Sequence, residues 1–307
     1  MADYKEKNAG SGVPSWKNNG YGKRRPTGNR NFGGAGSYGK SGQRPYAGSE
    51  SGADFQRNTE PMPGLVIGRN AVRELLKSER PIDKLYVKTG EREGSITMLV
   101  AEAVAKGVPI VEVDSAKLDS MSGGENHQGV IASAAEKEYT DVEGILNIAK
   151  ERGETPLIVI ADGIEDPHNL GAIIRCAECS GAHGIIIPKR RAVGLTPTVS
   201  KASAGAIEHI AVAKVNNISQ TIEKLKKNGI WIFAAEAGGT AYYDLDFNVP
   251  CAIVLGSEGD GVSKLVKDQS DFIASIPMYG SVNSLNVSTA AAVILCHAAR
   301  MQRTGTK

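Results

Sequence analysis

The sequence predicts an α/β protein whose C-terminal half folds into a parallel β-sheet with helices on both faces. Four short apolar runs rich in β-branched residues occur in that half, and segments with helical periodicity separate them. Strands with near-continuous apolar runs are buried on both faces, which is typical of a parallel sheet covered by helices. The predicted strands are 157–160, 184–187, 229–233 and 252–255.

The chain has 307 residues, enough for two compact domains of ordinary size. Its 41% apolar and 23% charged residues match a globular protein and exclude a fibrous or disulfide-dense class. The sequence contains no run of about 18 apolar residues and no apolar core of a signal peptide near its start. We therefore expect a cytoplasmic protein with no membrane partner and with free thiols.

A basic, Gly-rich segment precedes the first apolar patterns. Residues 1–62 contain almost no aliphatic side chains, so we expect them to be a disordered tail. Residues 1–64 hold ten Lys and Arg against five Asp and Glu, a balance of +5, whereas the rest of the chain sums to −3. Aromatic residues scattered among the basic ones suit base stacking in an RNA-binding arm. An inert solubilising tail is the alternative.

Ordered sequence is expected from about Leu65, where helical and strand patterns begin to alternate. The expected elements are a helix over 71–76, a strand over 84–88, a helix over 96–106, a strand over 108–113, a short helix at Leu118 and a strand over 130–134. This alternation predicts a small α/β domain at 63–137. A linker follows at 138–155, with a helix that Gly153 ends.

The third segment, residues 156–307, contains the predicted parallel sheet. Helices are expected at 169–180, 200–207, 218–227 and 288–303. In open α/β sheets, ligands bind at the carboxyl ends of the strands. We therefore expect functional residues in the loops that follow the strands.

Two loops follow predicted strands directly. The first, 162–175, contains Pro and Gly; Asn169 can cap the next helix, and Arg175 lies one to two turns into it. The second, 254–261, has glycines spaced G-x-x-G-x-G, which allow a ligand to approach the backbone closely. This spacing is not the dinucleotide fingerprint, so a nucleotide-dependent dehydrogenase is disfavoured.

A third loop, 276–290, leads into the last predicted helix. It brings together more hydroxyl and amide groups than a helix cap requires, so some of them are expected to bind a ligand. No metal site is expected. Cys176 and Cys179 have C-x-x-C spacing, but no second Cys or His pair at zinc spacing accompanies them.

Together, in this order and spacing, the three loops resemble the signature motifs of the SPOUT superfamily of RNA methyltransferases, in its TrmH-like branch. The resemblance covers about 156–303. Residues 64–136 resemble the L30e-like substrate-binding domain that precedes the catalytic domain in bacterial 23S rRNA (guanosine-2'-O-)-methyltransferases. The most specific part of this second match is the stretch 126–130, Asn-His-Gln-Gly-Val.

The resemblance implies a deep C-terminal trefoil knot, a homodimer with composite active sites, and S-adenosyl-L-methionine as methyl donor. The residues it assigns to the donor are Ala235, Glu236, Gly256, Ile276 and Leu285. Those it assigns to catalysis are Asn169, Arg175, Glu258, Ser284 and Asn286. It also implies that Lys201 faces RNA; a simple Ala-rich packing helix is the alternative for that segment.

The implied reaction moves a methyl group to a ribose 2'-hydroxyl, which requires in-line positioning and loss of the hydroxyl proton. A guanidinium keeps its proton in nearly any site, so Arg175 is expected to clamp a substrate phosphate and polarise the hydroxyl. Phosphate or water then takes the proton. Asn169, Ser284 and Asn286 are expected to orient the ribose, and Glu258 to organise its loop or Arg175.

The leading hypothesis for the substrate is a guanosine of 23S ribosomal RNA. A tRNA ribose 2'-O-methyltransferase is the alternative within the enzyme class, and the separate leading domain at 64–136 speaks against it. A non-catalytic RNA-binding factor for ribosome assembly is the alternative outside it, and the matched catalytic residues speak against that.

Overall fold

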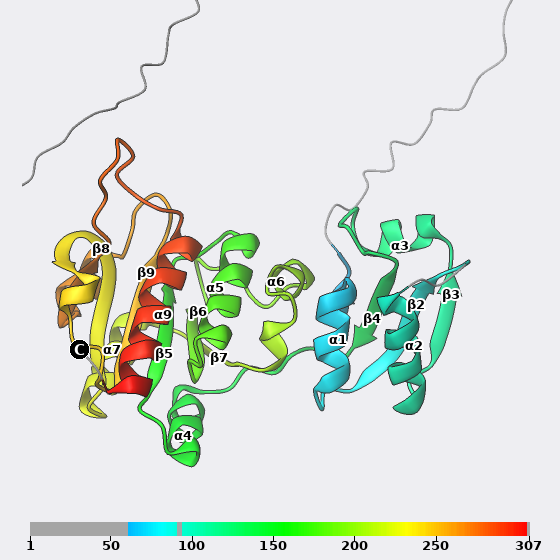
Figure 1. Cartoon of the computed structure of the whole chain (residues 1–307), viewed down its shortest axis with the longest axis horizontal. Coiled ribbons are helices and arrows are strands. Elements are labelled where there is room, and N and C mark those ends of the chain that lie inside the picture. Colours follow the sequence, from blue (N-terminus) through cyan, green and yellow to red (C-terminus); the bar gives the residue numbers. More distant parts are fainter. Residues whose placement is uncertain (1–60, 91–93, 306–307) are drawn as a thin grey trace, which may run out of the picture. The chain divides into compact units, whose positions relative to one another are not determined.

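The computed structural model describes residues 61–90 and 94–305, coloured along the chain in Figure 1. The expected basic tail, 1–62, lies outside the described residues except for its last two. The described chain forms two β-sheets, one of four strands and one of six.

The four-stranded sheet comes first in the sequence and has helices on both faces. Its elements are β1 (Leu65–Ile67), α1 (Arg69–Lys77), β2 (Ile82–Lys88), α2 (Ser95–Ala105), β3 (Ile110–Val113), α3 (Ser115–Met121) and β4 (Val130–Ala134). β4 pairs antiparallel with both β1 and β2, and β3 pairs parallel with β2. Apolar residues of α1 and α2 pack on one face, and those of α3 pack on the other.

The six-stranded sheet is parallel throughout, in the order β10-β8-β9-β5-β6-β7. Its strands are β5 (Leu157–Asp162), β6 (Gly184–Pro188), β7 (Ala211–Val215), β8 (Trp231–Ala241), β9 (Cys251–Gly256) and β10 (Phe272–Ser275). The four strands predicted from the sequence are the central ones. β7 and β10 are the two edge strands, and neither was predicted because a strand with a single neighbour needs a less continuous apolar run.

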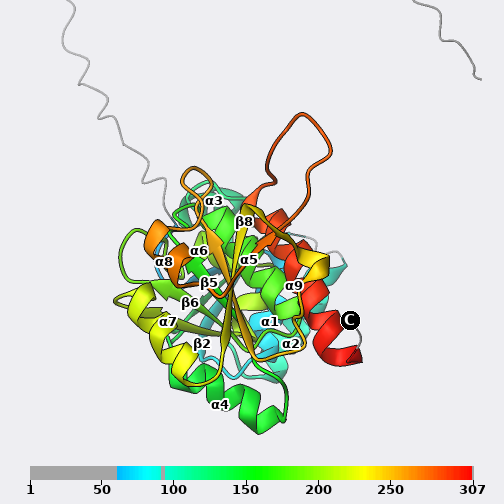
Figure 2. The ribbon, with the colours of Figure 1, turned by 90° about the vertical axis from the view of Figure 1, so that its left-hand side faces the viewer.

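Helices cover both faces of this sheet, which confirms the predicted α/β class. They are α4 (Val142–Arg152), α5 (Pro167–Cys179), α6 (Pro197–Ala202), α7 (Ile218–Lys227), α8 (Lys264–Gln269) and α9 (Val287–Thr304). α5, α6 and α9 pack on the face that carries Leu157 and Val159, whereas α4, α7 and α8 pack on the face that carries Ile158 and Ile160. Figure 2 shows α7 and α8 on one side of the strands and α9 on the other.

Two local predictions were wrong. The helix expected over 200–207 ends at Ala202, because Ala204 and Gly205 take positive φ angles of 52° and 92°, and a 3-10 turn follows. Asn169 does not cap the first motif's helix. Pro167 begins α5 at a position that needs no amide hydrogen, and the Asp166 carboxylate accepts the backbone N–H groups of His168 and Asn169.

None of the helices in the described ranges is long and apolar enough to cross a membrane.

The close packing of α5 on α6 depends on Gly171. A Cβ added to this residue would lie 2.4 Å from the Cβ of Ala202 and 2.8 Å from the carbonyl oxygen of Val199. Both neighbours belong to the short helix α6, and one of them is backbone, so neither can move without shifting the helix. Gly171 therefore brings the two helices into direct contact on the face of the sheet that carries the first motif.

Replacing Gly171 with valine is expected to lower the free energy of unfolding by about 2 kcal/mol, because the added side chain overpacks this contact. In a protein of this size the melting temperature should fall by roughly 4–8 °C in differential scanning calorimetry. Gly280→Val is the matched control, since nothing lies within 4 Å of a Cβ added there. Equal melting temperatures for the two variants would contradict the proposed contact.

Candidate active site

The first two motif loops begin side by side because β5 and β9 are neighbours in the sheet. Asp162, the last residue of β5, is paired in register with Gly256, the last residue of β9. Both strands run parallel, so both loops leave the same edge of the sheet. The strand order therefore joins loops that lie about ninety residues apart in sequence.

The loop after β9 folds back on itself in a tight turn. Ser257 and Gly261 exchange two backbone hydrogen bonds of 3.1 Å. A Cβ added to Gly256 would lie 2.0 Å from the carbonyl carbon of Gly261, so only glycine fits there without rearranging the turn. The glycine pattern thus serves to close the loop.

Two carboxylates from neighbouring strands fasten this turn to the sheet. Glu236 of β8 accepts a hydrogen bond from the Val262 backbone N–H at 3.1 Å. Asp162 of β5 accepts one from the Ser263 N–H at 2.9 Å. These two hydrogen bonds anchor the loop to β8 and to β5, and so they limit how far it can move when a ligand binds.

Residues from all three motifs meet at the side chain of Asn286. Its Nδ2 donates to Asn169 Oδ1 at 2.9 Å and to Glu258 Oε1 at 2.5 Å. Its Oδ1 accepts from the backbone N–H and the hydroxyl of Ser288, at 2.9 and 2.6 Å, and so caps α9. We call Asn169, Glu258 and Asn286 the amide cluster. Asn169 is only 8% exposed, so this cluster is partly shielded from water.

The other two predicted catalytic residues lie outside the amide cluster. Ser284 is exposed on the loop that leads to Asn286 and lines the same cavity as Asn286 and Glu258. Arg175 is exposed on α5 and lines neither of the two cavities described below. Within one chain, the structure therefore does not bring Arg175 to the other four.

A cavity of about 630 Å³ lies between the turn after β9 and the loop before α9. All five residues predicted to bind the methyl donor line it: Ala235, Glu236, Gly256, Ile276 and Leu285. We call it the donor cavity. Its other walls are apolar side chains, including Leu255 and Ile294, and the polar residues Glu258 and Asn286.

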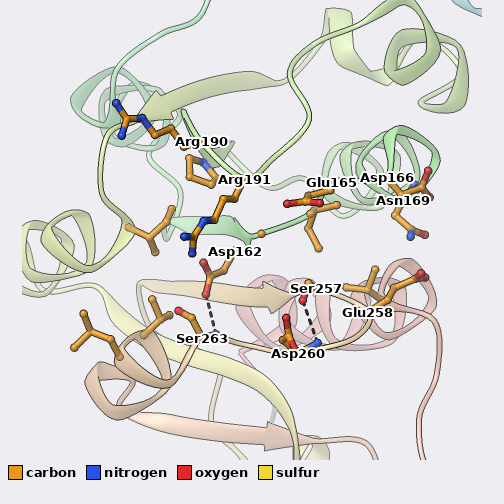
Figure 3. A pocket seen from close by; sticks show the side chains of 18 of the residues that line it. Asp162, Glu165, Asp166, Asn169, Arg190, Arg191, Ser257, Glu258, Asp260 and Ser263 are labelled. Atoms are coloured by element: carbon orange, nitrogen blue, oxygen red, sulfur yellow. Dashed lines mark hydrogen bonds between the residues drawn. The ribbon is translucent and has the colours of Figure 1, made fainter.

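A second cavity of about 570 Å³ adjoins the donor cavity and is shown in Figure 3. It lies between the first motif loop, the loop after β6 and the turn after β9. Asp162, Glu165, Arg190 and Arg191 line it, together with the amide-cluster residue Asn169. These two arginines were not predicted as site residues, although they lie in the loop that follows the predicted strand 184–187.

Burial makes three of the cysteine thiols in the described chain less acidic than a free thiol. Burial raises the pKa of the Cys251 thiol to about 12. Burial also raises the pKa of Cys176 and of Cys179, the pair with C-x-x-C spacing. Within the described ranges no group of three His, Cys, Asp or Glu side chains is placed to hold a metal ion.

Comparison with known families assigns both parts of the described chain. Residues 156–296 match the SpoU rRNA Methylase family, and residues 65–140 match the family described as RNA 2'-O ribose methyltransferase substrate binding. The chain is 47% identical over 231 residues to the TrmH family tRNA/rRNA methyltransferase YacO of Bacillus subtilis. The matched region covers 75% of this chain and 92% of that protein.

A TrmH family tRNA/rRNA methyltransferase of Staphylococcus haemolyticus is 45% identical over 232 residues, which cover 75% of this chain and 93% of that protein. These relatives are matched over nearly their whole length. The two family matches begin at residue 65, so the basic N-terminal segment lies outside both of them.

Solved structures show the same fold. A crystal structure of an RNA 2'-O ribose methyltransferase superimposes with a TM-score of 0.65 at 26% identity, covering 78% of this chain and 88% of that one. An AdoMet-bound rRNA methyltransferase from Sinorhizobium meliloti gives 0.63 at 25% identity, covering 77% and 86%. The SpoU methyltransferase AviRb from Streptomyces viridochromogenes, solved with AdoMet, gives 0.67 at 24% identity, covering 79% and 91%, a likeness of fold alone.

These matches confirm the family expected from the three motif loops and from the leading domain. The chain therefore belongs to the SpoU, or TrmH-like, family of RNA 2'-O-ribose methyltransferases.

Proposed function

We propose that the protein transfers a methyl group from S-adenosylmethionine to the ribose 2'-hydroxyl of a guanosine in 23S rRNA, and that it acts in the cytoplasm as a homodimer. One observation carries the assignment of the site: the amide cluster, built from all three motifs, borders the cavity lined by all five predicted donor residues. The segment 63–137 is proposed to bind RNA, 156–307 to catalyse, and the C-terminal part to be knotted.

The donor cavity suits S-adenosylmethionine in size and chemistry. Its volume of about 630 Å³ lies in the range of small-molecule sites. Apolar side chains such as Ile276 and Leu285 offer a surface for an adenine ring, and the cradle at Gly256 lets backbone groups reach a ligand. The carboxylates of Glu236 and Glu258 suit a cationic ligand. When bound, the donor supplies an electrophilic sulfonium methyl group.

The amide cluster is proposed to position the acceptor ribose. Because Glu258 and Asn169 both accept from Asn286, the three side chains fix each other's orientation. The Asn169 amide nitrogen makes no hydrogen bond among the described residues, so it remains able to donate to a ribose oxygen. Ser284, on the same cavity wall, is proposed to complete the contact. The hydroxyl proton leaves to water or to a substrate phosphate oxygen.

Arg175 is proposed to serve the site of the second subunit. Its guanidinium is exposed on α5 and lines neither cavity of its own chain. A twofold dimer places the same surface of each chain against the other, so a residue outside one site can complete its partner's. There Arg175 would clamp a substrate phosphate with its planar fork of donors.

The substrate class is tested by transfer of labelled methyl from S-adenosylmethionine to protein-free large-subunit rRNA and to bulk tRNA, with mapping at single-nucleotide resolution. We expect label at one guanosine ribose of the rRNA. Label in tRNA alone would establish the tRNA alternative. Donor binding with no transfer to either RNA, or to assembly intermediates, would favour a non-catalytic factor.

Asn286→Asp is expected to lower kcat/KM by about 100-fold or more, since the variant loses the Nδ2 donor that orients Asn169 and Glu258. Its carboxylate keeps the acceptor that caps α9, so the fold should persist. The matched control is Asn228→Asp, which loses an Nδ2 bond to the Lys224 carbonyl at the end of α7 and lines neither cavity. Unchanged methyl transfer by Asn286→Asp would exclude the amide cluster from catalysis.

Gly256→Ala is expected to weaken donor binding by about 100-fold, because the turn that forms the cavity wall must open to accept a Cβ. Isothermal titration with S-adenosylhomocysteine, the unreactive product, measures this effect. Gly280→Ala should bind as the wild type does, since its added methyl group meets no neighbour. Wild-type affinity in both variants would show that this turn does not form the donor site.

A mixed dimer tests the composite site. Arg175→Ala and Asn286→Asp chains with different tags are co-expressed, and the heterodimer is isolated on both tags. If Arg175 acts across the interface, one of the two sites contains every required residue, and about half of wild-type activity should return. Both parent homodimers should remain inactive. A heterodimer as inactive as its parents would place Arg175 in its own chain's site.

A further inference from the structure

The second cavity shares a wall with the donor cavity. Residues that line both are Ser257, Glu258, Asp260, Gly261 and Val287. The amide cluster lies at this boundary, because Asn169 lines the second cavity, Asn286 lines the donor cavity and Glu258 lines both. A ribose held by the amide cluster would therefore have the donor cavity on one side and the second cavity on the other. The second cavity is thus large enough and close enough to the amide cluster to take the attached base.

The charges of the second cavity disfavour a phosphate and favour a group that donates hydrogen bonds. Five carboxylates line it, from Asp162, Glu165, Asp166, Glu258 and Asp260, against two guanidinium groups. Three of these carboxylates already accept hydrogen bonds from protein groups, those of Asp162, Asp166 and Glu258. Among the described residues, the side chains of Glu165 and Asp260 accept no hydrogen bond. They can therefore accept hydrogen bonds from a ligand.

The two arginines of the second cavity differ in direction. In Figure 3 the Arg191 side chain reaches into the cavity toward Asp162, whereas Arg190 points away from it. The Arg191 backbone has a φ of 55°, in the left-handed region that residues with a side chain seldom adopt. Such conformations persist where the surrounding structure requires them, often at functional sites. Arg191 therefore supplies the inward-facing cation of this cavity.

A carboxylate and a guanidinium in one pocket match the edges of guanine. Guanine presents two adjacent donors, N1–H and the 2-amino group, on its Watson–Crick edge, and two acceptors, O6 and N7, on its major-groove edge. Arginine binds O6 and N7 with two parallel hydrogen bonds. A carboxylate accepts from both donors at once. Adenine, cytosine and uracil each lack both of these patterns.

Resting on the function proposed above, we infer that the second cavity receives the unstacked base of the acceptor nucleotide and selects guanine. Glu165 accepts from N1–H and the 2-amino group, and Arg191 donates to O6 and N7. The apolar side chains of Ile218, Val266 and Val287 contact the faces of the ring. A base enters such a pocket only after it leaves its stack, so single-stranded or loop RNA is the favoured substrate.

The inference is tested by binding of mononucleotides to the full-length protein saturated with S-adenosylhomocysteine. The probes are GMP, IMP, which lacks the 2-amino group, and AMP, which lacks O6 and N1–H. Wild type should bind GMP about 10-fold more tightly than IMP, and AMP more weakly than either. Equal affinity for GMP and AMP, or no binding of GMP, would overturn the inference.

Two variants separate the two contacts. Glu165→Gln should bind GMP and IMP equally, because one of its two acceptors is replaced by a donor. Arg191→Gln should weaken GMP and IMP alike by about 10-fold and keep the ratio between them, because both bases carry O6 and N7. Matched controls are Glu151→Gln and Arg152→Gln, at exposed positions near the end of α4 that line neither cavity. A GMP preference that survives Glu165→Gln would contradict the role of Glu165.

Failure of this inference is distinguishable from failure of the proposed function. Affinity for S-adenosylhomocysteine is measured for every protein in a separate titration without nucleotide and should not differ between them. If it is retained and methyl transfer proceeds while GMP binding shows no preference, the base pocket is refuted and the enzymatic function stands. If wild type binds no S-adenosylhomocysteine, the proposed function fails, and the inference fails with it.

Discussion

The pairing of β9 between β5 and β8 is the constraint on which the site depends. It aligns the ends of β5 and β9 at Asp162 and Gly256, so two motif loops emerge together. The carboxylates of Asp162 and Glu236, from the strands on either side, then bind the backbone of the turn after β9. A preorganised site requires rigid supports, and here each neighbouring strand contributes one.

Asn286 connects this arrangement to the rest of the fold. One end of its side chain caps the long helix α9, and the other holds Asn169 and Glu258. α9 in turn packs on α5, which carries Asn169. Asn286 therefore both orders the site and begins α9, so the site forms only when the helices and the sheet are in place.

The two cavities differ in the residues that form their walls. The donor cavity surrounds the glycine turn, with apolar residues such as Leu255 and Ile276 and polar residues such as Glu236, Glu258 and Asn286 in its walls. In the second cavity, the charged side chains of Glu165, Asp166, Arg190 and Arg191 come from the loops after β5 and β6. Side chains on loops can change without disturbing the sheet, so substrate selection is expected to reside there.

The sequence by itself determined the α/β class, the four central strands and the three motif loops, because strands buried on both faces and Gly- and Pro-rich loops leave strong local patterns. Family resemblance also predicted five residues that bind the donor, and all five line one cavity. Only the tertiary structure decided the edge strands β7 and β10, the capping of α5 by Asp166, and the placement of Glu165 and Arg191 in the wall of one cavity. The edge strands depend on which strands are neighbours in the sheet, and the cap of α5 depends on which side chain accepts from its first backbone N–H groups. No local pattern in the chain encodes either.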